Sequence, residues 1–211
     1  MKIIEPGYAL LFPVELNDDV ARGMLRHIEL AGRTCYKSED KMTPDSAAKF
    51  VRMIIQRGHE SVLEHVSITV LFIIDRGVSH ELVRHRIASF SQESTRYCNY
   101  GKSGEVTFIR PLFFDDASHA ELTWWDAMKN AEISYLELLK LGAKPQEARS
   151  VLPNSLKTEV VTTANLREWR HILRLRTSKA AHPQIRQVMV PLLNELQAKL
   201  SPLFEDIEEA T

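Results

Sequence analysis

The segment Val66–Asp75 (VSITVLFIID) limits the possible folds most strongly, because it is the longest apolar stretch of the chain. Its many β-branched residues favour a buried strand, which Arg76-Gly77 would end. A second strand is predicted over residues 157–163 (KTEVVTT). Neither stretch approaches the ~20 apolar residues that a membrane-spanning helix requires, so we expect no segment that crosses a membrane. The core should therefore be built around buried strands.

Amphipathic helical patterns with recognisable start and stop residues surround these strands. The expected helices run from Asn17 through Leu30, from Thr43-Pro44 to Gly58, over Val78–Ile87, from Asp116 or Ser118 to Gly142, from Pro145 to Pro153, from Asn165 to residue 178, and from His182-Pro183 onward. A kink or a restart is predicted at Pro191, because proline cannot donate a backbone hydrogen bond. Short strands are predicted at Tyr8–Val14 and Val106–Ile109, and a solvated acidic end is expected at Glu205, Asp206, Glu208 and Glu209.

Strands and helices do not alternate regularly along the chain, which argues against a doubly wound parallel sheet. We therefore predict an α+β fold in which an antiparallel sheet packs with helices. The 211 residues show no repeats or linkers and suffice for a sizeable core. Residues 1–211 are accordingly predicted to form a single domain.

Charge and cysteine content bear on partners and location. The net charge of −1 gives no reason to expect a nucleic acid or a membrane as a partner. The chain has two cysteines, Cys35 and Cys98, so neither a disulfide framework nor a cysteine-built metal site is expected. The start, Met1–Pro6, does not resemble a signal peptide, and a reducing, cytoplasmic location is expected.

Several metal and phosphate motifs fail on their spacing. His80 and His85 resemble a zinc-protease pair, but they would lie about 140° apart on a helix, so no metal ligand is predicted. Gly101-Lys102-Ser103 resembles the end of a P-loop, but Arg96 stands where that loop requires glycine. The chain has no Gly-x-Gly-x-x-Gly, and no Rossmann unit is indicated.

Positive charge gathers in residues 84–110 and 165–186, which suggests a site for an anionic ligand. If Val78–Ile87 is helical, Arg84 and Arg86 point about 200° away from each other. They would then suit two anions, or one ligand that lies across a subunit boundary.

The expected helix after Asn165 also carries arginines on two sides. Arg176 shares the apolar stripe of Trp169 and Ile172, so it should point inward. Spacing alone leaves open whether Arg176 forms a structural ion pair or contacts a ligand. The opposite side, where we expect a solvated face, carries Arg167, Arg170 and Arg174.

The run from Arg84 to Arg96, RHRIASFSQESTR, matches the motif R-H-R-x-x-S-x-x-x-x-S-x-R at every specified position. This motif is the signature of the flavin-dependent thymidylate synthases, and the chain resembles that family. Other segments agree in order and spacing: Gly58-His59-Glu60-Ser61 with Glu64-His65, Ala148-Arg149 with Val151-Leu152-Pro153, and Asn165-Leu166-Arg167 through Leu175-Arg176.

The resemblance implies the family's fold and an enzyme that makes dTMP. In this reaction a methylene group passes from 5,10-methylenetetrahydrofolate to C5 of dUMP, and tetrahydrofolate is released. A tightly bound FAD, reduced by NADPH, supplies the hydride, and no cysteine nucleophile takes part. The resemblance also implies a homotetramer whose active sites are shared between subunits.

Carried over by position, the resemblance also implies particular contacts. The implied FAD contacts are Ser61, Arg84, His85, Arg86, Gln92, Asn165, Leu166, Arg167 and His171. The implied dUMP contacts are Glu81, Leu82, Val83, Arg84, Gln92, Glu93, Ser94, Thr95, Arg96, Arg149 and Arg176. Arg176 is implied to be catalytic, because a guanidinium stabilises the deprotonated, activated uracil. The chain departs from the family's commonest residues at Glu81, His171 and Ala180, which bears on individual contacts.

Two other interpretations stand beside this one. A non-catalytic nucleotide-binding or RNA-binding module could use the same basic segments, although the chain lacks an aromatic-rich RNA motif. Another nucleotide-binding flavoenzyme, such as an NADPH oxidase-like reductase, would share the flavin and not the product. Visible flavin absorbance of the purified protein distinguishes the synthase from the first alternative. Formation of dTMP distinguishes it from the second.

Overall fold

The computed structural model describes residues 1–102 and 104–208, which pack as two compact units. The first unit comprises Met1–Gly7, Phe72–Arg84 and Phe90–Val161, and the second comprises Tyr8–Leu71, His85–Ser89 and residues 162–208 of the described chain. Strands β3 (Ser67–Asp75) and β6 (Lys157–Asn165) supply residues to both units. The prediction of a single domain stays a prediction.

The main sheet has four strands in the order β2-β3-β6-β4, with β2 at Gly7–Phe12 and β4 at Ala88–Gln92. The sheet is antiparallel and combines with helices, so the predicted α+β class is confirmed. Side chains of β3 alternate, with Ile68 and Val70 buried and Ser67 exposed. The strands predicted from the apolar run and from residues 157–163 are therefore both present.

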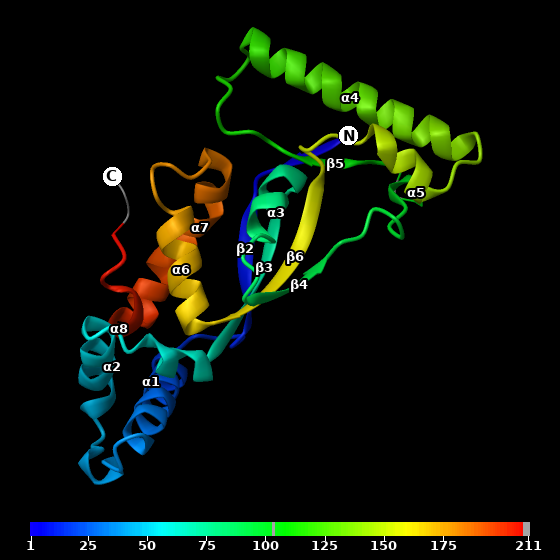
Figure 1. Ribbon diagram of the computed structural model, residues 1–211. Helices are drawn as coiled ribbons and strands as arrows, with labels where there is room; N and C mark the ends of the chain where they lie inside the picture. Colours follow the sequence, from blue (N-terminus) through cyan, green and yellow to red (C-terminus); the bar gives the residue numbers. More distant parts are fainter. Residues whose placement is uncertain (103, 209–211) are drawn as a thin grey trace. The chain divides into compact units, whose positions relative to one another are not determined.

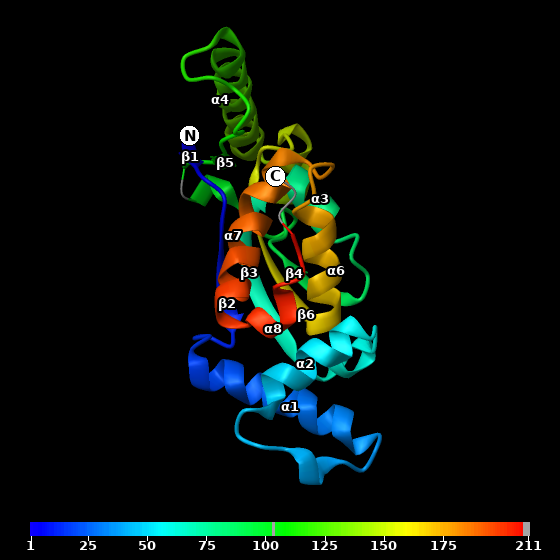
Figure 2. The ribbon, with the colours of Figure 1, turned by 90° about the vertical axis from the view of Figure 1, so that its left-hand side faces the viewer.

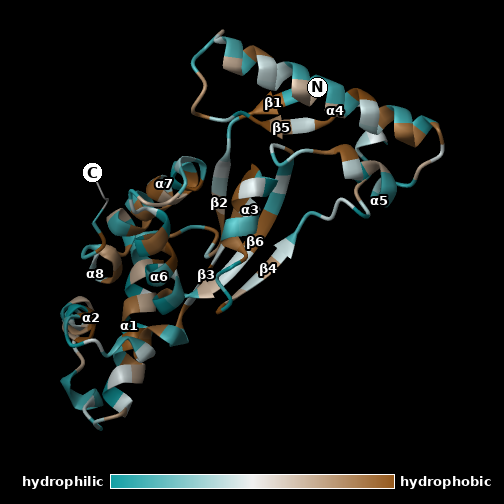
Figure 3. Cartoon of the chain, turned by 45° about the horizontal axis from the view of Figure 1, so that its top comes forward, coloured by the Kyte–Doolittle hydropathy of each residue, from teal (hydrophilic) through white to brown (hydrophobic). Residues whose placement is uncertain are grey.

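The first unit has its own small core beneath a long helix. Strand β1 (Lys2–Ile4) pairs in parallel with β5 (Thr107–Ile109), and both carry apolar residues (Figure 3). Helix α4 (His119–Lys140) starts at Ser118, whose side chain accepts from the Glu121 N–H. The core joins these elements through Val106, Phe108, Trp124, Met128, Tyr135, Ala148 and Leu156. The unit also contains α3 (Arg76–Leu82), α5 (Pro145–Ala148), η3 (Tyr100–Lys102) and η4 (Arg149–Val151).

The second unit is mainly helical. Its elements are α1 (Asp18–Thr34), η1 (Glu39–Lys41), α2 (Ser46–Gln56), η2 (Glu60–His65), α6 (Leu166–Arg176), α7 (Pro183–Lys199) and α8 (Ser201–Phe204). Helices α1 and α2 lie against each other, and α6 packs on both α7 and η2 (Figures 1 and 2). Trp169 of α6 is fully buried and donates its indole N–H to the Ile68 carbonyl at 3.0 Å. This contact ties α6 to the second unit's part of β3.

The helix predicted over Val78–Ile87 is wrong at its C-terminal end. The Asp75 side chain caps the Val78 N–H at 2.8 Å, so α3 starts at Arg76 and ends at Leu82. Arg84 lies in the turn that follows, and Ala88–Gln92 form β4 instead of a loop. The angular separation of Arg84 and Arg86 derived from a helix therefore does not apply.

Two expectations for the C-terminal region hold only in part or stay untested in part. The restart that was one alternative at Pro191 does not occur, because α7 continues through it and the buried Leu192, Leu193 and Leu196 continue its apolar stripe. The other alternative, a kink, stays a prediction. The acidic residues Glu205, Asp206 and Glu208 are exposed, as predicted for a solvated end. Two of them are also ion-paired, which was not predicted: Glu205 pairs with Arg52, and Asp206 pairs with two arginines of α6. Glu209 lies outside the described residues. Within the described chain, no helix combines the length and the apolar character needed to cross a membrane.

Candidate active site

Helix α6 organises one group of predicted site residues in the second unit. Asn165 caps the helix by accepting a hydrogen bond from the Glu168 N–H at 2.9 Å. The buried faces of Trp169 and Ile172 fix its rotation about the helix axis. Arg176, its last residue, then directs its Nε–H to Nε2 of His85 at 3.0 Å. The structure thus brings together two residues of the predicted site that are 91 positions apart.

His85 is held neutral by its surroundings. Burial first, and then the charges of Arg176 and His171, together lower its pKa to about 4. Nε2 accepts the Arg176 hydrogen bond, so the ring proton of neutral His85 belongs on Nδ1. That nitrogen lies 3.7 Å from Oε1 of Glu168, whose own pKa burial raises. Arg176 therefore contacts a neutral acceptor and keeps its full charge.

Glu168 is a member of this cluster that the sequence-based prediction did not include. In the sequence, Glu168 was identified only as the third residue of the helix that Asn165 caps. Its position three residues before His171, one helical turn away, was the available signal.

The same cluster has atoms capable of binding a metal. Ligand atoms of His85, Glu168 and His171 lie within 4.8 Å of one another. The guanidinium of Arg176 contacts His85, and a fixed cation at that place opposes a second cation. The prediction that no metal ligand is present stays a prediction.

A large pocket in the second unit receives two of the predicted FAD contacts, Ser61 and Arg167. Its volume is about 1150 Å³, which exceeds the roughly 300–1,000 Å³ of ordinary small-ligand pockets. It is lined by Gly32, Arg33, Cys35, Tyr36, Ser38, Lys41, Ser46, Lys49, Phe50, Met53, Ile54, Arg57, Gly58, His59, Ser61, Val62 and Arg167. These described lining residues include several cations and no carboxylate, so the pocket suits an anionic ligand. The residues from α1 and α2 were not anticipated, because their cations are scattered in the sequence.

A second group of predicted residues lies in the first unit, around the end of β4. Arg149 donates from Nη1 to Oγ1 of the buried Thr95 at 3.0 Å. Gln92 donates from Nε2 to Ser79 and Thr158, at 2.9 and 3.2 Å. The structure therefore brings two predicted dUMP contacts, Thr95 and Arg149, into direct hydrogen bonding.

Glu93 is held in place by neighbours that the prediction did not name. The Tyr100 hydroxyl donates to it at 2.8 Å, and Lys157 Nζ lies 3.0 Å from its other oxygen. Burial first, and then the bond to Glu93, raises the pKa of Tyr100, so its hydroxyl remains a donor. The carboxylate of Glu93 thus helps to fix the loop that carries Ser94 and Arg96.

The remaining predicted residues differ in exposure. Leu82 and Leu166 are fully buried, so their side chains serve packing. Glu81 and Val83 are half-buried, and Arg84, Arg86 and Arg96 are exposed. The guanidinium of Arg96 lies over the ring of Tyr97 at 5.4 Å from its centroid.

The expected solvated face of α6 is wrong for Arg170. Its side chain has no exposed surface and pairs with Asp206 and Glu60. The helical spacing correctly separates this side from the Trp169 side, but η2 and the residues after α7 cover it. Arg167 and Arg174 are exposed as predicted, and each is ion-paired.

The fold and these groups define an α+β protein with a pocket lined by cations and an arginine fixed on a neutral histidine. Residues 19–202 match the family model described as "Thymidylate synthase complementing protein". The flavin-dependent thymidylate synthase of Corynebacterium glutamicum is 37% identical over 216 residues, covering 94% of this chain and 85% of that protein. The enzyme of the same description from Mycobacterium tuberculosis is 39% identical over 202 residues, covering 87% and 80%. The chain belongs to the family of flavin-dependent thymidylate synthases.

Proposed function

We propose that this enzyme methylates dUMP to dTMP, with 5,10-methylenetetrahydrofolate as the carbon donor and tetrahydrofolate as a product. NADPH is the proposed reductant of a tightly bound FAD, and the flavin supplies hydride when it is bound. The bond from Arg176 to His85 is the observation that carries the proposal. It fixes a cation at the end of α6 against a neutral partner, which leaves the positive charge available to an anionic base.

Arg176 is the proposed catalytic residue. Its guanidinium would stabilise uracil that has lost the N3 proton, and the low dielectric of a half-buried position strengthens that attraction. The other cations of the two groups would bind and orient dUMP, with Arg149, Arg96 and Arg84 directed to its phosphate. Glu81, Leu82, Val83, Gln92, Glu93, Ser94 and Thr95 complete the proposed dUMP set.

The proposed FAD contacts are Ser61, Arg84, His85, Arg86, Gln92, Asn165, Leu166, Arg167 and His171. Support comes from the cationic pocket, because Ser61 and Arg167 line it and its volume accommodates a dinucleotide. Hydroxyl, amide and imidazole groups in this set can pair with ribose, phosphate and the flavin ring.

We also propose that the chain acts as one domain within a homotetramer whose active sites are shared between subunits. The exposed apolar residues Tyr97 and Ile87, at 79% and 71% exposure, are consistent with burial in such an assembly. Light scattering of the purified protein tests the mass directly, and a monomeric mass would contradict the proposal.

The decisive experiment measures dTMP formation from dUMP, 5,10-methylenetetrahydrofolate and NADPH, with and without added FAD. The expected result is a yellow protein whose dTMP formation requires flavin. Flavin reoxidation that does not respond to dUMP and gives no dTMP would favour an oxidase-like flavoenzyme instead. If the protein takes up no FAD, both the synthase and the oxidase-like flavoenzyme are rejected.

A further inference from the structure

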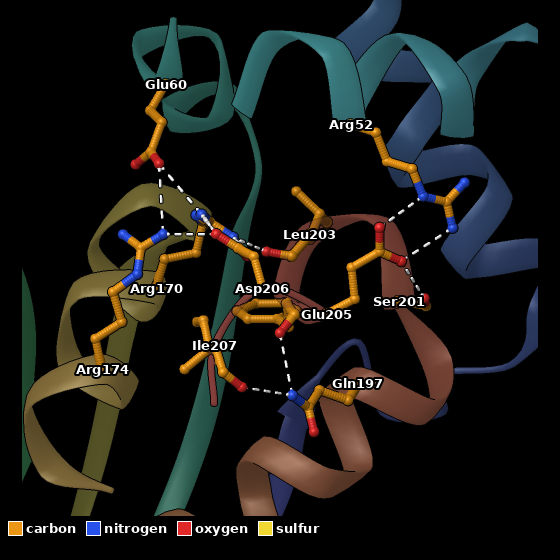
Figure 4. A network of polar contacts seen from close by, with 11 residues as sticks. Arg52, Glu60, Arg170, Arg174, Gln197, Ser201, Leu203, Glu205, Asp206 and Ile207 are labelled. Carbon is orange, nitrogen blue, oxygen red and sulfur yellow. Dashed lines mark hydrogen bonds and ion pairs between the residues drawn. The ribbon is translucent and has the colours of Figure 1, made fainter. Parts of the chain in front are cut away.

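Arg170 carries a buried positive charge that has no role in the proposed reaction. It lies on α6, and its side chain has no exposed surface. Both of its Nη atoms donate hydrogen bonds to Asp206, at 2.7 and 2.8 Å, and Nη1 also donates to the Leu203 carbonyl (Figure 4). A bidentate arginine–carboxylate pair has a defined geometry, so the segment after α7 is fixed on α6.

The same guanidinium holds a second carboxylate. Nη2 of Arg170 donates to Oε1 of Glu60 at 3.2 Å. Arg174, one turn further along α6, lies 2.9 Å from Asp206 and 3.7 Å from Glu60. Two cations and two carboxylates thus alternate, and the removal of one carboxylate leaves the buried Arg170 with one carboxylate instead of two.

Glu60 connects this network to the pocket. It is the first residue of η2, and it lies between the pocket-lining residues His59 and Ser61. At the other end of η2, Glu64 accepts from Arg167 at 2.6 Å. Helix α6 therefore holds η2 at both ends, and Asp206 sets the charge balance at one of them.

The chain after α7 is itself well anchored. Gln197 donates to the carbonyls of Phe204 and Ile207 at 3.1 and 2.9 Å, and Ile207 is 2% exposed. Hydrogen bonding from Arg170 holds the pKa of Asp206 below its usual range, which keeps the carboxylate charged. Asp206 is thus a fixed, ionised partner for Arg170.

We propose that Asp206 and Arg170 are positioning residues for flavin binding: the C-terminal segment holds η2, and with it Ser61, in the wall of the pocket. This inference rests on the proposed flavin site. It adds a dependence of flavin affinity on residue 206, which itself does not line the pocket.

The test compares Asp206→Asn with Glu205→Gln in the full chain. Both substitutions remove one charge from an arginine pair, but Glu205 pairs with Arg52 of α2, whereas Asp206 pairs with the arginine that holds Glu60 of η2. We expect Asp206→Asn to weaken FAD binding about tenfold, which corresponds to ~1.4 kcal/mol. Glu205→Gln should remain within about twofold of the wild type, since it leaves the network intact. FAD titration at a temperature where each variant is folded gives both values.

Amide hydrogen exchange of residues 59–64 is the second measurement, and it needs no flavin. Faster exchange there in Asp206→Asn, and not in Glu205→Gln, is expected. Faster exchange combined with unchanged FAD affinity would reduce the network to a structural role and overturn the proposal. Unchanged exchange in Asp206→Asn would overturn it as well. If the wild type binds no FAD, the proposed function fails on its own, and exchange still reports on the hold over η2.

If Asp206→Asn does not fold, Glu60→Gln carries the test. The Glu60 side chain is 21% exposed. The substitution removes its charge but keeps the bond between Arg170 and Asp206, so the buried cation stays paired. Weakened FAD binding and faster exchange of η2 are expected again. Wild-type values in both measurements would overturn the proposal.

Discussion

At the scale of single residues, α6 carries two arginines in different surroundings: Arg176 contacts the neutral His85, and Arg170 is buried between carboxylates. The signature motif and the inward stripe of α6 identify His85 and Arg176, and the structure joins them at 3.0 Å. Arg170 could not be interpreted in the same way, because a helical wheel does not say what covers each side. Its partner Asp206 is 36 positions away, in a tail whose composition suggested only solvent exposure.

Arg176→Ala is expected to keep bound FAD and lose most turnover. The apolar face of α6 is unchanged by the substitution, but the cation that would stabilise activated uracil is removed. Loss of one such electrostatic group typically costs about 10²–10³ in kcat. Steady-state dTMP formation measures the effect, with the exposed Lys179→Ala as a control for loss of a nearby charge. Wild-type turnover in Arg176→Ala would refute the proposed activation.

The lowered pKa of His85 predicts how stability depends on pH. The folded state resists protonation down to about pH 4, whereas the unfolded chain takes up the proton near the ordinary value of 6.5. Stability from this residue is therefore complete above pH 6.5 and is lost as the pH falls from 6.5 toward 4. The loss should reach about 3 kcal/mol, at 1.36 kcal/mol per pKa unit.

Urea unfolding at pH 7 and pH 4.5 of the wild type and His85→Gln isolates this contribution. The variant lacks the titrating ring, so its stability should fall less over the same interval. Asp206 does not confound the comparison. Its pKa is lowered in the folded state, so its contribution to stability is lost only as the pH falls below its ordinary pKa of 3.8. Equal losses in the two proteins would show that His85 is not the group responsible.

At the scale of elements, cap residues, long periodic segments and the short strands β2 and β5 were predictable, whereas the short strands β1 and β4 were not. Asn17, Ser118 and Asn165 each cap the helix that was expected to begin there. Strand β4 was missed because its pairing in the sheet with β6 outweighs the loop-like composition of the signature motif. Strand β1 was missed because its parallel partner, β5, is distant in the sequence.

Asn165 tests whether a cap is also a ligand contact. Asn165→Ala should destabilise the protein by ~1 kcal/mol, because the Glu168 N–H loses its acceptor. Asn165→Ser keeps a capping oxygen and should recover most of that stability. If the amide also contacts FAD, serine will restore the melting temperature and leave FAD affinity reduced. Full recovery of both properties would limit Asn165 to capping.

At the scale of the whole molecule, the sequence motif contains only part of the proposed site. The residues proposed for dUMP lie mostly in the first unit, whereas Arg176 and most residues proposed for FAD lie in the second. Such a division could not be read from spacing, because the chain passes between the units several times. A protein in which subunits share sites would combine these groups from different copies.

Subunit sharing predicts complementation between two inactive variants. If Arg149 and Arg176 of one site come from different subunits, a random mixed tetramer of Arg149→Ala and Arg176→Ala chains contains some sites with both arginines. With equal expression, about a quarter of the sites are then intact, since a symmetric assembly gives each subunit the same contribution. Co-expressed, tandem-tagged tetramers should therefore recover roughly that share of wild-type dTMP formation, compared with either variant alone. Mixed tetramers no more active than the parent variants would place both arginines of a site in one subunit.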